Sequence, residues 1–331
     1  MLKRLVFLAF FGFSSVSAAA AQTPVNPASV LLGLQQMDQR VATVGHRLAR
    51  ANLDICSRTM PLSGLLVHST EQYAGPLRSI VASAFGLGAE PGVLTVVPGS
   101  AADRAGLKPG DSILSIAGKS FPMTKVRKNG SYDRVKEVEE SLLESLAKGP
   151  AQIETLRGSE RRSVTLQPEP GCLSRVQILP SPKLNAHADG TYAQVTSAIV
   201  EFARNDDELA LILAHEMAHN ILSHRTRLDG QKVSRGIFKT FDGSAPKIKA
   251  TEIEADYFAL YLVARAGYDV SAAPGFWRRF GPGGLLELFS DGTHPGKGAR
   301  AAAAERTILE IKAKQQQGLP LTPDLPRPKG S

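Results

Sequence analysis

Two histidines with three residues between them, the first followed directly by a glutamate, constrain this chain more than any other feature. His215 and His219 stand four residues apart in the run LAHEMAHN, with Glu216 between them. Side chains four apart share one face of a helix, so both imidazoles can reach one cation. Two neutral imidazoles and one further ligand leave an open position for water on a tetrahedral zinc. The pattern predicts zinc, one ion per chain, with Glu216 as the general base.

The residues around this motif predict a buried helix. Asn205 or Asp206 can cap it, and Asp207 and Glu208 place negative charge at the positive end of its dipole. The stretch Leu209–Ala214 carries no polar side chain, so we expect this helix to be covered nearly all round.

The third ligand has to come from elsewhere in the chain. In the zinc motif that adds a third histidine six residues on, position 222 would be glycine and position 225 histidine; this chain has Leu222 and Arg225. His224 is one residue out of register, and we expect it to be a solvated or capping histidine.

An acidic cluster at the start of a later apolar helical run offers the alternative ligand. Glu252 and Asp256 lie four residues apart and share a face, whereas Glu254 points away from both. We therefore expect Glu252 to bind the metal and Asp256 to orient a ligating histidine. A solvated acidic helix start would give the same cluster without any metal.

Taken in order, these motifs resemble a known family. His-Glu-x-x-His, then Glu-x-Glu-Ala-Asp beginning at Glu252, then Thr293-His294-Pro295 with Arg300 downstream, is similar to the HtpX and CAAX-prenyl-protease family of zinc metallopeptidases. The resemblance covers residues 185–311. It implies that Glu252 is the third zinc ligand, and that His294 lies near the metal and either assists the reaction or blocks the open coordination position. Arg300 is expected either to hold the His294 loop or to meet the oxyanion.

The segment before the zinc helix keeps part of the pattern of that family. Asn185-Ala186 is retained, but the residues after it are more polar than the strand to which relatives are thought to add their substrate backbone. We expect His187 to be a strand residue and not a ligand.

The first residues are those of an exported protein. Lys3 and Arg4 precede an apolar run, and Ala19–Ala21 offers a small-residue cleavage site, so residues 1–21 are expected to be a signal peptide and the product periplasmic. No later segment reaches the ~20 apolar residues that a membrane span needs. The net charge of +8 comes without an arginine-rich or aromatic-interleaved tract, so we expect no nucleic-acid partner.

Two cysteines fit an oxidising compartment. Cys56 and Cys172 are the two cysteines of the chain, and we expect them to form a disulfide. Two buried free thiols are the alternative. The pair brackets an apparent insertion.

The sequence between the cysteines changes to short strands separated by glycine turns. Val93–Val97, the small-residue segment after it and Ser112–Ile116 resemble a bacterial PDZ domain of the kind fused to periplasmic proteases. The resemblance implies a groove that binds C-terminal peptides or unfolded segments by strand addition. The run Phe85, Gly86, Leu87 and Gly88 is either its carboxylate-binding loop or an ordinary turn.

The expected fold class is α+β: a mainly helical zincin metalloprotease domain with a small sheet, interrupted by an inserted β-rich PDZ domain. We expect the following parts: signal peptide 1–21, N-terminal helix of the protease domain 22–62, PDZ-like domain 63–170, metalloprotease core 171–312, and disordered proline-rich tail 313–331. Residues 226–249 are expected to form a loop between the two ligand helices, either a lid or a plain connection.

These features predict a periplasmic zinc metalloendopeptidase that cleaves unfolded or misassembled envelope proteins. The alternative is a PDZ-bearing envelope chaperone or assembly factor whose metal site is latent because His294 occupies it.

Overall fold

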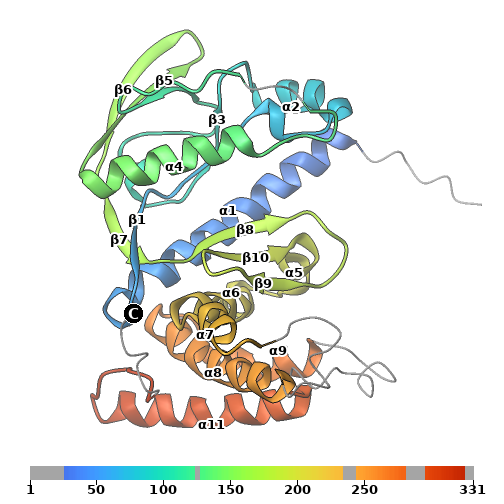
Figure 1. The fold of residues 1–331 in the computed structure, drawn as a ribbon, viewed down its shortest axis with the longest axis vertical. Coiled ribbons are helices and arrows are strands. Elements are labelled where there is room, and N and C mark those ends of the chain that lie inside the picture. Colours follow the sequence, from blue (N-terminus) through green and yellow to red (C-terminus); the bar gives the residue numbers. More distant parts are fainter. Residues whose placement is uncertain (1–25, 124–126, 234–243, 281–294, 325–331) are drawn as a thin grey trace, which may run out of the picture.

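Two packed units, joined by one long helix, make up the protein in the computed structural model (Figure 1). The structure describes residues 26–123, 127–233, 244–280 and 295–324. The expected signal peptide and His294 lie outside these ranges. As expected, the fold combines a mainly helical part with a separate β-rich part.

The β-rich unit is a five-stranded antiparallel sheet in the order β2-β3-β4-β5-β6. Its elements are β2 (Leu65–His68), α2 (Arg78–Phe85), β3 (Gly92–Val96), α3 (Ala101–Arg104), β4 (Ser112–Ile116), α4 (Asp133–Lys148), β5 (Ala151–Arg157) and β6 (Glu160–Leu166). A hairpin joins β5 and β6, and Gly158 at its turn adopts φ 62°. Alternate residues of β5 are buried, and they pack with α4 in a core of their own.

A two-stranded ladder closes the base of this unit. β1 (Thr59–Leu62) pairs antiparallel with β7 (Glu169–Cys172). Cys56 and Cys172 form a disulfide there, with Cα atoms 5.5 Å apart, as the sequence predicts. The chain thus enters and leaves the β-rich unit at one point.

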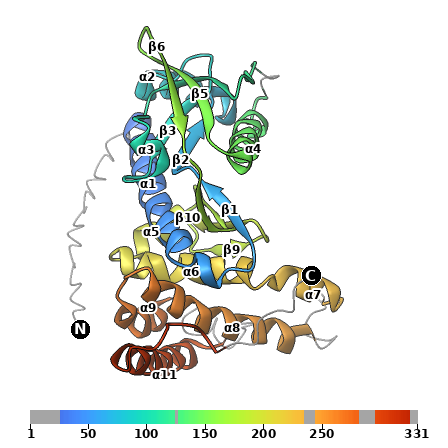
Figure 2. The same ribbon diagram turned by 90° about the vertical axis from the view of Figure 1, so that its left-hand side faces the viewer.

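The second unit holds the motif helices and a three-stranded sheet in the order β8-β10-β9. Its elements are β8 (Arg175–Leu179), β9 (Ala186–Ala188), β10 (Tyr192–Thr196), α5 (Ser197–Phe202), α6 (Asp206–Ile221), α7 (His224–Gly230), α8 (Ser244–Arg265), α9 (Ala273–Arg279) and α11 (Lys297–Gln316). The sheet lies on one side of α6, while α8 and α11 lie on the other (Figures 1 and 2).

Helix α1 (Pro27–Ala51) runs from the β-rich unit to the helical unit (Figure 1). Asn26 caps it by accepting a hydrogen bond from the backbone N–H of Ala28, and Pro27 suits its first turn. Its buried face includes Val44 and Leu48, which pack in the core around α6. At its other end Leu31 packs against α2 of the β-rich unit.

Two expectations about irregular segments were wrong. Much of the supposed loop 226–249 is helical, because α7 extends to Gly230 and α8 begins at Ser244. The tail expected to be disordered from residue 313 continues α11 to Gln316, and the chain then packs Leu321 against the core. Polar composition misled both predictions, since an exposed helix face is as polar as a loop.

None of the described helices combines the length and the apolar character that a bilayer crossing requires. Aromatic residues contribute to the core of the helical unit: Phe276 and Trp277 are buried, and Phe280 packs against them.

Candidate metal centre

Helix α6 presents the first two histidines from a buried position. Asn205 caps it by accepting a hydrogen bond from the N–H of Glu208, 3.0 Å away, and acidic residues fill its first turn. The helix is covered on nearly every side, as expected from the apolar stretch before the motif. Burial on all sides fixes the helix, and with it the direction of the His215 and His219 side chains.

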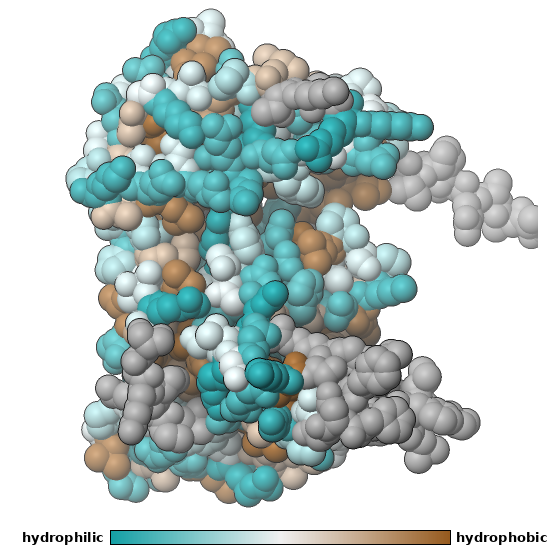
Figure 3. Space-filling model, in the orientation of Figure 1, coloured by the Kyte–Doolittle hydropathy of each residue, from teal (hydrophilic) through white to brown (hydrophobic). Residues whose placement is uncertain are grey.

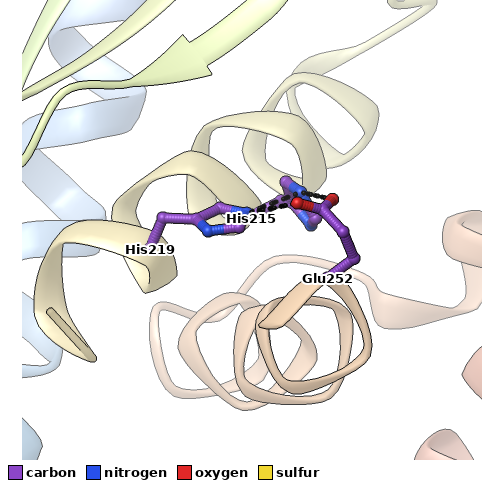
Figure 4. A group of neighbouring side chains, drawn as sticks. All are labelled: His215, His219 and Glu252. Atoms are coloured by element: carbon purple, nitrogen blue, oxygen red, sulfur yellow. Dashed lines mark hydrogen bonds and ion pairs between the residues drawn. The ribbon is translucent and has the colours of Figure 1, made fainter. Parts of the chain in front are cut away.

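Helix α8 packs across α6 and brings Glu252 to the two imidazoles (Figure 4). His215 Nε2 lies 3.2 Å from His219 Nε2 and 3.3 Å from Oε2 of Glu252, and His219 Nε2 lies 3.4 Å from Oε1, the other oxygen of that carboxylate. The two imidazoles and the carboxylate therefore form a triangle of ligand groups, with one ligand atom of each within 4.8 Å of the others.

The size of this triangle fits zinc. With metal–ligand bonds of about 2.0–2.1 Å, the ligand atoms of a tetrahedral zinc are separated by about 3.3 Å, the edge of such a tetrahedron. Two nitrogen lone pairs and a carboxylate that face one another this closely need a cation or a proton between them. These residues fit a divalent ion with a free fourth position.

His215 is held from behind by a carboxylate, as the sequence predicts. Its Nδ1 donates to Asp256 Oδ1 at 2.9 Å. Arg300 from α11 donates its Nε to Asp256 Oδ2 at 2.8 Å, and its guanidinium lies 3.4 Å over the ring of Trp277. Among the described residues, Arg300 thus acts on the site through Asp256. This arrangement leaves His215 Nε2 free to bind a metal.

His219 is held by a relay that the sequence analysis missed. His224 was expected in solvent or at a helix end, yet it is 1% exposed and its Nδ1 lies 2.9 Å from His219 Nδ1. Its Nε2 donates to Glu254 at 3.0 Å, and Arg227 donates to the same carboxylate at 2.7 Å. Ser223, in the left-handed region at φ 53°, turns the chain back so that His224 meets His219.

Glu254 points away from the ligand face of α8, as expected, and on that side it accepts hydrogen bonds from His224 and Arg227. The signal that could have revealed this relay is the spacing of His224, five residues after His219 across a helix end. Periodicity along one helix cannot show it, because the turn lies between the two histidines.

Burial and hydrogen bonding shift the pKa values of the ligands in opposite directions. Burial opposes a charged imidazole at His215, yet hydrogen bonds to Asp256 and Glu252 raise the pKa of His215 to about 10. Burial lowers the pKa of His219 to about 3, with the His215 charge adding to the effect. The metal-free site therefore holds a proton at His215, and a bound cation takes the place of that proton.

Glu216 lies beside the ligand triangle without a hydrogen-bond partner in the described part of the chain. Its side chain is 6% exposed, and burial raises its pKa to about 7. A carboxylate with a pKa near neutrality can both take and return a proton at physiological pH. This is the property that a general base requires.

The run of residues 85–88, expected to be either a carboxylate-binding loop or an ordinary turn, lies at the end of α2. Phe85 is the last residue of α2, and Gly86 ends that helix in the left-handed conformation at φ 62°. Phe85 and Leu87 pack with Leu31 of α1. The structure therefore assigns these residues a helix end that packs on α1. Gly88 follows in the same connection to β3.

Sequence comparison finds two families in separate parts of the chain. A model for Peptidase family M48 matches residues 159–241, which include His215 and His219 and end before Glu252. A PDZ domain model matches residues 92–127, which hold β3, α3 and β4. One part of the chain is thus similar to a peptidase family and another part to PDZ domains.

Individual relatives are distant. Mitochondrial metalloendopeptidase OMA1 of Schizosaccharomyces pombe is 26% identical over 164 residues, which are 43% of this chain and 48% of that protein. The chain therefore spans about half the length of this curated relative.

Two solved structures are similar to part of the chain. The HtrA3 PDZ domain bound to a phage-derived ligand covers 34% of this chain and 89% of its own, at 18% identity and a TM-score of 0.26. The HtrA-type protease AlgW with a decapeptide covers 33% and 29%, at 23% identity and a TM-score of 0.24.

Proposed function

We propose that this protein is a zinc-dependent metalloendopeptidase. The observation that carries the proposal is the triangle of His215 Nε2, His219 Nε2 and the Glu252 carboxylate, next to the buried carboxylate of Glu216. The two nitrogens lie 3.2 Å apart, and they lie 3.3 Å and 3.4 Å from one oxygen each of Glu252. The match to a peptidase family across α6 supports it. Within that family, the motif order favours the HtpX and CAAX-prenyl-protease type.

In this proposal the protein residues have separate tasks. Zinc, when bound, supplies a Lewis acid and lowers the pKa of a water molecule. Glu216 accepts the proton of the attacking water and delivers it to the leaving amine nitrogen. Asp256 and His224 keep the two imidazoles in the orientation that leaves each Nε2 free.

We propose polypeptides as substrates, specifically unfolded or misassembled envelope proteins in the periplasm. The PDZ match supports a chain segment as the bound species. The sheet beside α6 ends in β9, an edge strand that holds His187 and can take up an extended backbone. A substrate strand on β9 would place a peptide bond beside the helix that bears the motif.

Replacing Glu216 by glutamine tests the activity. We expect Glu216→Gln to bind one zinc per chain and to lose at least about a thousandfold in the rate of casein cleavage, because the base is gone and the ligands remain. Zinc is measured by atomic emission and cleavage by release of labelled fragments. Glu201→Gln, on the exposed side of α5, is the matched control and should cleave normally.

The same experiment addresses the rival function, a PDZ-bearing chaperone with a latent metal site. A wild-type protein that binds zinc, suppresses aggregation of an unfolded client and cleaves nothing would favour the chaperone. If His294 keeps the site closed, His294→Ala should instead raise cleavage.

A further inference from the structure

Asn220, the residue after the second histidine of the motif, is a buried polar side chain on a largely apolar helix. It is 1% exposed, and the other buried polar residues of α6 are Glu208, His215 and Glu216. Glu208 pairs with Arg279, and the other two belong to the metal centre. A buried amide needs hydrogen-bond partners, so the contacts of Asn220 have to be accounted for separately.

Both polar atoms of the Asn220 side chain have a partner. Its Oδ1 accepts from the N–H of Gly190 at 2.8 Å, and its Nδ2 donates to Ser174 Oγ at 2.9 Å. Asn220 stands about 100° around the helix from His219, so it faces the sheet while His219 faces the metal centre. The side chain therefore ties the turn between β9 and β10 to the helix that carries two of the ligands.

The turn between β9 and β10 needs this bond for one of its backbone groups. Asp189 Oδ1 accepts from the N–H of Thr191 at 2.8 Å and from that of Tyr192 at 2.7 Å. The N–H of Gly190 is left for Asn220, and Gly190 adopts φ 101°, which favours glycine. Asp189 thus closes the turn from within, and Asn220 attaches it to α6.

Two arginines bind the carbonyls of the same turn from its exposed side. Arg58 donates to the carbonyl of Gly190 at 3.0 Å, and Arg225 of α7 donates to the carbonyl of Asp189 at 3.1 Å. Water competes for these exposed bonds, whereas the bond to Asn220 is partly buried. The bond to Asn220 is therefore the contact that fixes the turn most firmly.

The other side of the hairpin borders a cavity. This cavity of 440 Å³ lies between α4, the edge of β2, α1 around Asp38, and strands β8 and β10, and both Asp189 and Tyr192 line it. The space-filling view is hollowed between α4 and the strands beneath it (Figure 3). The Tyr192 hydroxyl donates to Glu139 of α4 at 3.2 Å. The position of the turn is therefore set mainly from the side of α6.

Strand β9 depends on this turn for its position. It pairs with β10 on one side and is the outer strand of its sheet among the described residues. Its last residue, Ala188, stands two residues before Gly190, and Asn220 directly follows His219. The hydrogen bond between Asn220 and Gly190 thus links the end of the edge strand to the backbone next to a metal ligand.

We propose that Asn220 is a positioning residue for peptide cleavage. By holding the β9–β10 turn against α6, it keeps the edge of β9 at a fixed place relative to His219 and so orders the strand that takes up the substrate backbone. This role rests on the proposed peptidase function and its strand mode of substrate binding. Asn220 acts through the turn and not on the reacting atoms, so its loss should weaken substrate binding and spare the metal centre.

Steady-state kinetics separate this role from a general loss of structure. We expect Asn220→Ala to raise the KM for fluorescein-labelled casein about tenfold and to change kcat less than about twofold, because only substrate binding is impaired. Its zinc affinity, measured with a zinc-binding dye, should equal that of the wild type.

A second variant disturbs the same turn without altering α6. Gly190→Ala should also raise KM, because alanine disfavours φ 101°, although its Cβ would find space, with Arg225 Cδ 3.8 Å away. Tyr192→Phe is the matched control, since it removes the bond to Glu139 from the same hairpin. It should leave KM unchanged.

Hydrogen exchange measures the Asn220–Gly190 bond itself and needs no enzymatic activity. In full-length Asn220→Ala we expect the amide of Gly190 to exchange at least about tenfold faster than in the wild type, while the amides of α6 stay protected. Tyr192→Phe should show wild-type exchange at Gly190. The readout is mass spectrometry of fragments that end on either side of Gly190.

Three results would overturn the role of Asn220: unchanged exchange at Gly190, an unchanged KM in both turn variants, or a loss of zinc affinity in both. If Asn220→Ala does not fold, Gly190→Ala carries the same test from outside the helix. A wild-type protein that cleaves no casein would refute the proposed peptidase together with this role. A wild-type protein that cleaves casein, with an unchanged KM in the variants, would refute this role alone.

Discussion

His224 shows how a single residue fixes the chemical form of a metal ligand. Its Nε2 faces the Glu254 carboxylate, an acceptor, so this nitrogen carries the proton. Burial lowers the pKa of His224, so its ring is neutral and its Nδ1 accepts. His219 therefore donates from Nδ1 and keeps the Nε2 lone pair for the metal.

Removing this relay should weaken metal binding. We expect His224→Ala to lower zinc affinity by about 10–100-fold, because His219 then loses the partner that fixes its tautomer and orientation. The measurement is competition with a zinc-binding dye. His187→Ala, on the edge strand β9, is the matched control. Unchanged zinc affinity in His224→Ala, with the fold intact by circular dichroism, would show that the contact is only packing.

Asp38 should make the stability of the protein depend on pH. Its pKa rises from 3.8 to about 7 in the folded state, so between these values the folded chain binds more protons than the unfolded chain. Stability should therefore fall as pH rises from about 4 to 7. Tyr73 and Tyr132 face this carboxylate and stay neutral throughout that range.

Asp38→Asn should remove this dependence. We expect the variant to melt at least about 2 °C higher than the wild type at pH 8, with the difference shrinking toward pH 4, where both side chains are neutral. Differential scanning fluorimetry across this pH range measures it. A difference that grows toward acid pH would contradict the assigned ionisation.

At the scale of elements, α8 serves both imidazoles from two of its faces. Glu252 and Asp256, one turn apart, reach His215 from the face packed on α6, while Glu254 points toward α7 and reaches His224. One helix therefore supplies a ligand and the supports of both histidines. Any shift of α8 along α6 would disturb all three contacts together.

The β1–β7 ladder lies where the chain enters and leaves the β-rich unit. The disulfide beside it closes a long loop and so restricts the conformations of the unfolded chain. Replacing Cys56 and Cys172 by serine should lower the free energy of unfolding by about 2–5 kcal/mol, because the unfolded chain regains the freedom of a long closed loop. Urea unfolding measures this. Wild-type protein treated with a reductant should match the double variant, and equal stability with and without the bond would refute the prediction.

At the scale of the whole molecule, the parts that sequence predicts well are those governed by local periodicity. The spacing of Glu252 and Asp256 on a helix places both on one face, and the structure brings both to His215. Strand alternation and glycine turns likewise predict the β5–β6 hairpin. The disulfide is predicted from the presence of two cysteines and from the expected oxidising compartment, and it is present.

The parts that sequence misses depend on contacts across turns and between units. His224 meets His219 only because Ser223 reverses the chain, and no repeat along one helix encodes this. The cavity at Asp38 needs α1, β2 and β8 to meet, which is a property of packing. The exposed polar residues Lys247 and Gln315 belong to helices whose buried faces are formed by other residues.

Trp277 stacks on Arg300 and lies 6.1 Å from the ring of His215, and it is the only tryptophan of the chain. The tryptophan fluorescence of the protein therefore comes entirely from a position beside the metal ligands. Cobalt quenches the fluorescence of nearby indoles, so titration with cobalt should lower the fluorescence of Trp277 in proportion to the fraction of metal sites that are filled. The fluorescence of Trp277 thus reports the fraction of protein that holds metal, and no added label is needed.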